Sequence, residues 1–298
     1  MRLVPLLAVV LVGCAAPARG PVSGGPNSGG IVSTNPCADA MLVDLAPERL
    51  TAISFYSHDP AATSLPLDVA RRFPATAGTA EEVIALRPAL VVTSSFTPLA
   101  TRAAYTRAGL KTLLLDSPAT VAASEAQIRM LAAAVGEPGR GEAMIARIEK
   151  ALVNALPPSA LPRRRPGPSR EPSATGPRPS PGKRIAETST LLFISGTLAN
   201  GPGNLLDELM ARAGLTNAAP DYGLAYTGPV ALETIAAHPP ALILTPGLSR
   251  SADLRVKVLA RMRAPTRSAT FARNLINCGG PTIVPAITRL AELRRGQP

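Results

Sequence analysis

One fourteen-residue pattern occurs twice in this chain and constrains its fold more than any other feature. Residues 81–94 read EEVIALRPALVVTS, and residues 233–246 read ETIAAHPPALILTP. Each copy opens with an acid, which favours a helix N-terminus, and continues with apolar residues at helical spacing and a proline before a short apolar run. Each copy therefore predicts a short helix that leads directly into a buried strand. Because repeated patterns mark duplicated units, we expect two related α/β lobes with a ligand cleft between them.

Segments typical of strands and helices alternate around both copies. This alternation predicts an α/β fold with mainly parallel sheets, in which one long rigid helix joins two similar lobes. Further strands are expected at residues 31–34, 50–55, 112–115 and 190–195, and helices at 251–263 and from about 282 to 294. The expected organisation is a signal peptide at 1–14, a flexible tether at 15–30, an N-terminal α/β lobe at 31–117, an interdomain helix at 118–156 with one interruption at 136–139, a disordered Pro/Arg-rich insertion at 157–184 and a C-terminal α/β lobe at 185–298.

The positive charge of the chain is mostly local. The net charge is +11, and seven basic residues less one acid place +6 of it in residues 157–184. The nine prolines and few apolar residues of this segment predict disorder, because it cannot bury enough surface to offset its ordering entropy. An arginine-rich site for anionic lipid or nucleic acid is the alternative to a solvated loop. We expect no nucleic-acid partner.

The N-terminal segment has the pattern of an export signal. Arg2 precedes an apolar run from Leu3 to Val12, which is too short to span a bilayer as a permanent helix. Residues 11–14, Leu-Val-Gly-Cys, resemble a bacterial lipobox, so we expect Cys14 to be the lipid-modified first residue of a periplasmic protein anchored to the membrane. Cleavage at the Ala-Pro-Ala sequence of residues 16–18 is the alternative and would release a soluble periplasmic protein.

Two cysteines remain once Cys14 carries lipid. Cys37 and Cys278 would lie in an oxidising compartment, which allows a disulfide between them. Two unpaired thiols are the alternative. Since the two residues come from opposite lobes, a bond between them would hold the groove nearly closed.

Five segments, in the same order, resemble the periplasmic solute-binding proteins of ABC importers for vitamin B12, ferric siderophores and haem. They read IVSTNPCADAML, EEVIALRPALVVT, GPGNLLDELMARAGLTNAA, ETIAAHPPALILTPG and NCGGPTIVPAITRLAEL. The resemblance implies two α/β lobes joined by a long rigid helix, with the ligand in the groove between them. It also implies delivery of that ligand to an ABC permease and its ATPase, by a binding protein that is not an enzyme and has no cofactor of its own.

The resemblance gives a role to one acid in each repeat. Glu81 and Glu233 stand where such proteins dock onto arginines of the permease, and the adjacent Glu82 is a second candidate in the first copy. The alternative is that these acids only favour their helix N-termini, at about 0.3–1 kcal/mol each.

The candidate ligand site follows from the expected sheets. In open α/β sheets the ligand lies beyond the carboxyl ends of the strands, so the loops after the strands should face the groove. Their aromatic, amide and hydroxyl groups suit a large flat ligand with polar edges, and the absence of arginine disfavours a strongly anionic siderophore. We expect a corrinoid first, then a ferric siderophore or haem, for which His58 or a tyrosine would be an axial ligand. The candidate ligand residues are Asn35, Cys37, Tyr56, His58, Ser95, Phe96, Thr197, Tyr222, Tyr226, Cys278 and Gly279.

Other classes of function fit the sequence less well. His58 and His238 are its two histidines, too few for a multi-histidine zinc site, and no nucleotide-binding glycine motif occurs. A thiol-dependent hydrolase that uses Cys37 and His58, with Asp59 as a third member, is the enzyme alternative. A structural lipoprotein without a ligand is the other alternative, although the duplicated lobes favour binding.

Overall fold

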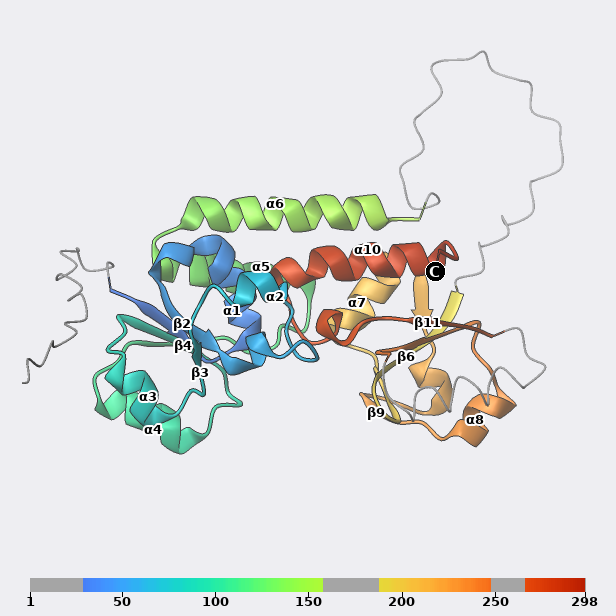
Figure 1. Ribbon diagram of the computed structural model, residues 1–298. Helices are drawn as coiled ribbons and strands as arrows, with labels where there is room; N and C mark the ends of the chain where they lie inside the picture. Colours follow the sequence, from blue (N-terminus) through green and yellow to red (C-terminus); the bar gives the residue numbers. More distant parts are fainter. Residues whose placement is uncertain (1–28, 158–187, 248–265, 298) are drawn as a thin grey trace, which may run out of the picture.

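The computed structural model describes residues 29–157, 188–247 and 266–297, which form two α/β lobes (Figure 1). The two-lobed architecture with mainly parallel strands confirms the fold class expected from the repeat. The predicted signal peptide with its lipobox, the tether up to residue 28, the insertion from residue 158 onward and the helix expected at 251–263 lie outside the described residues.

The first lobe contains a five-stranded sheet in the order β3-β2-β1-β4-β5, and all its neighbouring strands are parallel. Because the strands are parallel, their carboxyl ends share one edge of the sheet, and the loops that follow them meet there. The strands are β1 (Ile31–Ser33), β2 (Leu50–Ser54), β3 (Ala75–Thr76), β4 (Leu90–Thr93) and β5 (Thr112–Leu114). The helices are α1 (Pro36–Leu45), α2 (Leu67–Ala70), α3 (Ala80–Ala85), α4 (Leu99–Arg107) and α5 (Val121–Val135).

Apolar residues cover both faces of this sheet. Ile31 and Val92 belong to the main core, whereas Val32 and Val91 pack in a smaller cluster with Tyr105 of α4. A parallel sheet buried on both faces requires continuous apolar strands, which is why β1 and β4 read as unbroken apolar runs rather than as alternating ones.

The second lobe has a sheet in the order β11-β10-β6-β7-β9, with β8 also paired to β6. Strands β8, β10 and β11 extend the sheet in parallel, but β7 runs antiparallel to both β6 and β9. The strands are β6 (Thr188–Ser195), β7 (Leu198–Ala199), β8 (Leu215–Asn217), β9 (Gly228–Pro229), β10 (Leu242–Thr245) and β11 (Arg267–Thr270). Helices α7 (Leu205–Arg212) and α8 (Leu232–Ala237) complete the lobe.

Both repeat copies fold as a short helix followed by a buried strand. Helix α3 leads into β4, helix α8 leads into β10, and all four residues of each strand are buried. The helix starts differ, however. In the first copy the Thr79 side chain accepts the Glu82 N–H, and the Glu82 carboxylate accepts the Ala77 N–H at 2.9 Å. In the second copy Ala231 precedes α8 and provides no side-chain cap.

Two long helices lie along the same side of both lobes. Helix α6 (Pro138–Ala155) crosses the top of the view in Figure 1, and α10 (Ile283–Arg294) lies beside it. Ile148 of α6 and Leu290 of α10 belong to one buried cluster together with Leu42 of the first lobe and Leu209 of the second. The two lobes therefore share a continuous apolar core. Within the described ranges, no helix is long and apolar enough to cross a membrane.

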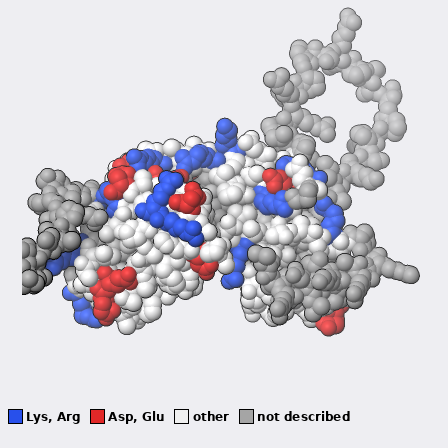
Figure 2. Space-filling view, in the orientation of Figure 1, with Lys and Arg blue, Asp and Glu red and all other residues white. Residues whose placement is uncertain are grey.

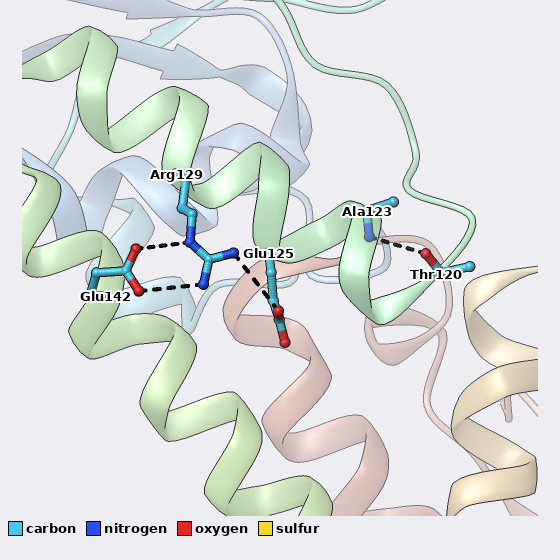
Figure 3. A network of polar contacts seen from close by, with 5 residues as sticks. All are labelled: Thr120, Ala123, Glu125, Arg129 and Glu142. Carbon is cyan, nitrogen blue, oxygen red and sulfur yellow. Dashed lines mark hydrogen bonds and ion pairs between the residues drawn. The ribbon is translucent and has the colours of Figure 1, made fainter.

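The segment expected to form the interdomain helix consists of two helices, α5 and α6, separated at Gly136 and Glu137, within the interruption expected at residues 136–139. A left-handed backbone at Gly136 ends α5, and Pro138 begins α6. The guanidinium of Arg129 on α5 then donates to both carboxylate oxygens of Glu142 on α6, at 2.9 and 3.4 Å (Figure 3). This exposed pair also raises the pKa of Arg129 and ties the second helix to the first.

Charged side chains are mixed in sign on the described part of the face drawn in Figure 2. On the face drawn in Figure 2, acidic and basic groups lie close to one another, and uncharged residues cover much of both lobes. The described part of this face thus lacks the uniform basic stripe that typifies nucleic-acid-binding domains.

Candidate functional site: a pocket at the carboxyl edge of the first sheet

A cavity of about 620 Å³ lies at the edge of the first sheet where the strands end. Its size falls within the range of small-ligand pockets. Most of the lining comes from the loops after β1, β2, β3, β4 and β5, as expected for a parallel sheet. These residues are Thr34, Asn35, Pro36, Cys37, Ser54, Phe55, Tyr56, Ala62, Thr76, Ala77, Gly78, Ser94, Phe96, Thr97, Pro98, Leu115, Asp116 and Ser117, joined by Arg273, Asn277 and Cys278 of the C-terminal part of the chain.

Three aromatic side chains line this cavity. The rings of Phe55 and Tyr56 have centroids 4.1 Å apart, and Tyr56 is 50% exposed. Phe96, after β4, is 83% exposed. The whole chain has only five Phe, four Tyr and no Trp, so a third of its aromatic residues face one cavity. Exposed rings that gather at a pocket offer flat apolar area to a ligand.

A buried carboxylate positions the two neighbouring rings. Phe55 and Tyr56 belong to the 3₁₀ turn Phe55–His58, and Asp39 of α1 lies beneath it. Asp39 Oδ2 accepts the Ser54 N–H at 2.9 Å and the Ser57 hydroxyl at 2.6 Å. Burial raises the pKa of this carboxyl to about 7, and Oδ1 has no hydrogen-bond partner among the described residues.

The pocket floor is fixed by the N-terminus of α1. The Asn35 side chain accepts the Cys37 N–H at 3.0 Å as the helix cap and donates to the Leu115 carbonyl at 2.8 Å. Pro36 occupies the first helical turn, where its missing N–H costs nothing. Asn35 therefore links the ends of β1 and β5, and its amide is already used by the protein.

One segment of the C-terminal part of the chain closes the pocket, and we call residues 273–280 the strap. A disulfide joins Cys278 of the strap to Cys37. The Ser64 hydroxyl donates to the Asn274 carbonyl at 2.9 Å, and the Gly280 N–H donates to the Ser124 hydroxyl at 2.7 Å. These anchors all lie in the first lobe, so the strap is attached there although its sequence belongs to the second.

Glycine is required at the end of the strap for steric reasons. A Cβ at Gly279 would lie 2.6 Å from Pro118 Cγ and from Ser124 Oγ, and one at Gly280 would lie 2.8 Å from Met41 Cγ. Gly280 also has a φ of +61°, a left-handed backbone that favours glycine. The Cys-Gly-Gly sequence thus allows the strap to approach α1 and α5 closely.

Two charged side chains line the cavity, Asp116 and Arg273. Asp116 accepts the Ser95 N–H at 2.7 Å, and this hydrogen bond lowers the pKa of its carboxyl. Arg273 lies on the strap and is exposed. The sequence-based expectation of a site without arginine is therefore wrong for this cavity, because the strap was not recognised as part of it.

The structure brings some of the candidate ligand residues together and separates others. Asn35, Cys37, Tyr56, Phe96 and Cys278 line the cavity, whereas Thr197, Tyr222, Tyr226 and Gly279 do not. Ser95 points its N–H at Asp116, and its neighbour Ser94 lines the cavity instead. Tyr226 is 77% exposed in the second lobe, and the Tyr222 hydroxyl donates to the His238 carbonyl at 2.6 Å.

His58 has a structural role in this arrangement. Its Nε2 lies 3.1 Å from the carbonyl oxygens of both Ala70 and Phe73, which end α2 and the turn after it. The ring therefore holds this turn and does not line the cavity. With Cys37 bonded to Cys278, the thiol-dependent hydrolase alternative lacks both its nucleophile and its base.

Sequence reasoning missed residues for two reasons. Phe55 was omitted although it directly follows β2, and Thr76 ends a two-residue strand that has no periodicity to detect. Arg273 and Asn277 reach the cavity through tertiary contacts of the strap. The pair Cys37 and Cys278 was the one sequence signal that could have placed the strap.

Among the described residues, no group of three His, Cys, Asp or Glu side chains is arranged to hold a metal ion.

Comparisons with known proteins lead to binding proteins rather than to enzymes. The family model described as "Periplasmic binding protein" matches residues 31–159. A comparison with curated protein sequences finds no significant match. Among solved structures, the chain is similar to the periplasmic haem-binding protein RhuT from Roseiflexus sp. RS-1, with 23% identity and a TM-score of 0.68 over 90% of this chain and 98% of that one.

Two further structures, both from Vibrio cholerae, have the same fold. The periplasmic haem-binding protein HutB is 16% identical, with a TM-score of 0.64 over 88% of this chain and 97% of that one. The periplasmic vitamin B12-binding protein BtuF is 14% identical, with a TM-score of 0.60 over 90% of this chain and 97% of that one. Identities this low establish the shared fold alone. The chain thus has the two-lobed fold that the sequence implied, and its residues 31–159 match the model of the periplasmic binding protein family.

Proposed function

We propose that this protein is the extracytoplasmic substrate-binding component of an ABC importer, and that it captures a metal chelate with a large flat ring system. The single observation that carries the proposal is the convergence of Phe55, Tyr56 and Phe96 on one cavity in a chain poor in aromatic residues. Aromatic faces supply contact area for a planar ligand, and the surrounding hydroxyl and amide groups fix its orientation.

The ligand classes that fit best are a corrinoid and a haem. Structural neighbours include binders of both, which supports a tetrapyrrole-like chelate without choosing between them. For haem, Tyr56 is the candidate axial ligand, because it lines the cavity and His58 does not. A ferric siderophore is the third class. Because Arg273 lines the cavity, a lack of arginine no longer argues against an anionic siderophore.

Delivery to a permease is proposed from the two repeat acids. Glu81 on α3 and Glu233 on α8 are exposed, neither lines the cavity, and the two helices lie on the side of the molecule opposite α6 (Figure 1). Glu82 is the weaker candidate, because its carboxylate already accepts the Ala77 N–H. An exposed acid on each lobe, on the same side, suits a partner that presents two basic sites.

A periplasmic location follows from the family, and anchoring through lipid on Cys14 remains part of this proposal. The export signal lies outside the described residues, so the sequence pattern alone supports it. Mass spectrometry of the native N-terminal peptide tests it. A peptide that begins at Arg19 without an acyl group would contradict the lipid anchor.

The binding function is tested by spectroscopic titration with cyanocobalamin, haemin and a panel of ferric siderophores. Tyr56→Ala is expected to weaken binding about tenfold, equivalent to about 1.4 kcal/mol. Tyr226→Ala is the matched control, since this tyrosine is also exposed but does not line the cavity. Loss of affinity in Tyr226→Ala with none in Tyr56→Ala would place the ligand on the second lobe. Failure of every chelate to bind would contradict the proposed function.

A further inference from the structure

Arg273 is a cation at the cavity that has no partner in the described part of the protein. It lies in the 3₁₀ turn Arg273–Leu275 at the start of the strap and is exposed. None of the ion pairs or side-chain hydrogen bonds between described residues involves its guanidinium, although it lines the cavity. An unpaired guanidinium at a ligand cavity is available to an anion that enters.

The other charge of the cavity does not neutralise Arg273. Asp116 comes from the loop after β5, and its carboxylate is committed to the Ser95 N–H. The two side chains form no ion pair in the structure. Among the described lining residues, Asp116 therefore accepts a backbone hydrogen bond, whereas the guanidinium of Arg273 is available to the ligand.

The strap fixes the position from which Arg273 reaches the cavity. The residue next to it, Asn274, is tied to the Ser64 hydroxyl, and the far end of the strap is held by the Cys37–Cys278 disulfide and by Ser124. These anchors order the backbone before any ligand arrives. A group that is already positioned loses less conformational entropy on binding, which strengthens its contribution to affinity.

We propose that Arg273 recognises a carboxylate on the rim of the ligand, and that the cavity consequently prefers acid-bearing chelates over neutral ones of the same shape. A guanidinium presents two parallel N–H donors, which match the two oxygens of a carboxylate. The aromatic residues then contact the flat face of the chelate while Arg273 holds its acidic edge. This inference rests on the proposed function and adds a ligand class to it.

The test compares one chelate with and without its acids. Haemin carries two carboxylates, and haemin dimethyl ester has the same ring without them. We expect the unaltered protein to bind haemin about 10- to 100-fold more tightly than the diester. Arg273→Gln should remove most of this preference by weakening haemin alone, and Arg273→Lys should retain part of it, because an ammonium keeps the charge without the paired donors.

Arg267→Gln is the matched control. Arg267 belongs to β11, is exposed and does not line the cavity, so its loss changes the net charge equally. Its affinities for both probes should equal those of the unaltered protein, and all variants should unfold at the same temperature. If Arg273→Gln weakens haemin and its diester equally, or weakens neither, carboxylate recognition is overturned.

Cyanocobalamin and ferrichrome, a ferric hydroxamate without net charge, complete the panel and separate two failures. If the protein binds either of them but shows no preference for haemin over its diester, the receptor function stands and the role of Arg273 fails. If it binds none of the four probes, the proposed function fails as well.

Discussion

The two lobes contain the same helix–strand repeat but contribute very unequally to the cavity. In the first lobe, β1 ends at Ser33, and the chain passes through Thr34 and Asn35 directly into α1 at the cavity floor. In the second lobe, β6 lies beside the repeat strand β10, as β1 lies beside β4 in the first. After β6, however, the chain turns back through Gly196 and Thr197 into the antiparallel strand β7. Duplication thus gives both lobes a similar architecture, but the connections after their central strands differ, and among the described residues the first lobe supplies most of the lining of this cavity.

The strap makes this asymmetry larger. Arg273, Asn277 and Cys278 are the C-terminal residues that line the cavity, and their segment is attached to the first lobe. The candidate ligand site is consequently a first-lobe cavity completed by a short piece of the second lobe. The lobes also share a continuous apolar core with α6 and α10.

The largest expected effect concerns the one feature that the lobes should share equally, which is docking to the permease. Reversal of both repeat acids, Glu81→Lys with Glu233→Lys, should abolish uptake in cells while the affinity of the purified protein for its ligand stays within about twofold. Each single reversal should cause a comparable partial loss of uptake. Uptake assays and ligand titration measure the two quantities.

Glu82→Lys is the matched control for the first lobe, because this acid is adjacent but accepts the Ala77 N–H. It should reduce stability more than uptake. Weakened ligand binding in the double reversal would instead put the repeat acids in the cleft and would contradict their role in docking.

Removal of the disulfide tests whether the strap belongs to the first lobe. The bond closes a loop with a sequence separation of 241 residues. Replacement of both cysteines, Cys37→Ser with Cys278→Ser, should lower the free energy of unfolding by about 2–5 kcal/mol. Because the strap loosens, affinity should also fall by about tenfold. Urea unfolding and ligand titration measure these effects.

Ser64→Ala provides a milder version of the same test. It removes the hydrogen bond to the Asn274 carbonyl and should cost about 0.5–1.5 kcal/mol. Reduction of the unaltered protein by dithiothreitol should reproduce the double serine variant. Unchanged affinity after loss of the disulfide would contradict its role in positioning the strap.

The last expected effect concerns Asp39, the buried carboxyl beneath the aromatic turn of the first lobe. Burial raises its pKa from the ordinary 3.8 to about 7, so the folded protein binds this proton more tightly than the unfolded chain does. The contribution to stability is therefore complete below about pH 4 and is lost as the pH rises toward about pH 7.

Asp39→Asn should remove this dependence, because an amide does not titrate. The free energy of unfolding of the unaltered protein should fall between about pH 4 and about pH 7 by on the order of 2 kcal/mol more than that of the variant. Urea unfolding of both proteins across this range measures the difference in the free energy of unfolding. Because both proteins share the other carboxylates, the contributions of those groups cancel in this difference. Parallel curves for the two proteins would contradict the raised pKa.

Much of the fold could be predicted because local patterns decide it. The repeat predicted both helix–strand units, and the expected strand at residues 112–115 matches β5 within one residue. Short elements escaped prediction, since β3, β7 and β9 have two residues each and no detectable period. Strand β11 was also missed, because most of its residues are exposed and its strand conformation depends on pairing with β10.

The sequence by itself determined the two α/β lobes, the long helical connection and the edge of the sheet at which the cavity lies, because parallel strands place the loops after them at one edge. Asn35, Tyr56 and Phe96 follow from this rule. The tertiary structure decided which lobe holds the cavity and that Arg273 faces it. Both depend on contacts between residues far apart in sequence, such as Ser64 with Asn274 and Ser124 with Gly280. The physical reason is that the strap's glycines permit the chain to approach the first lobe closely.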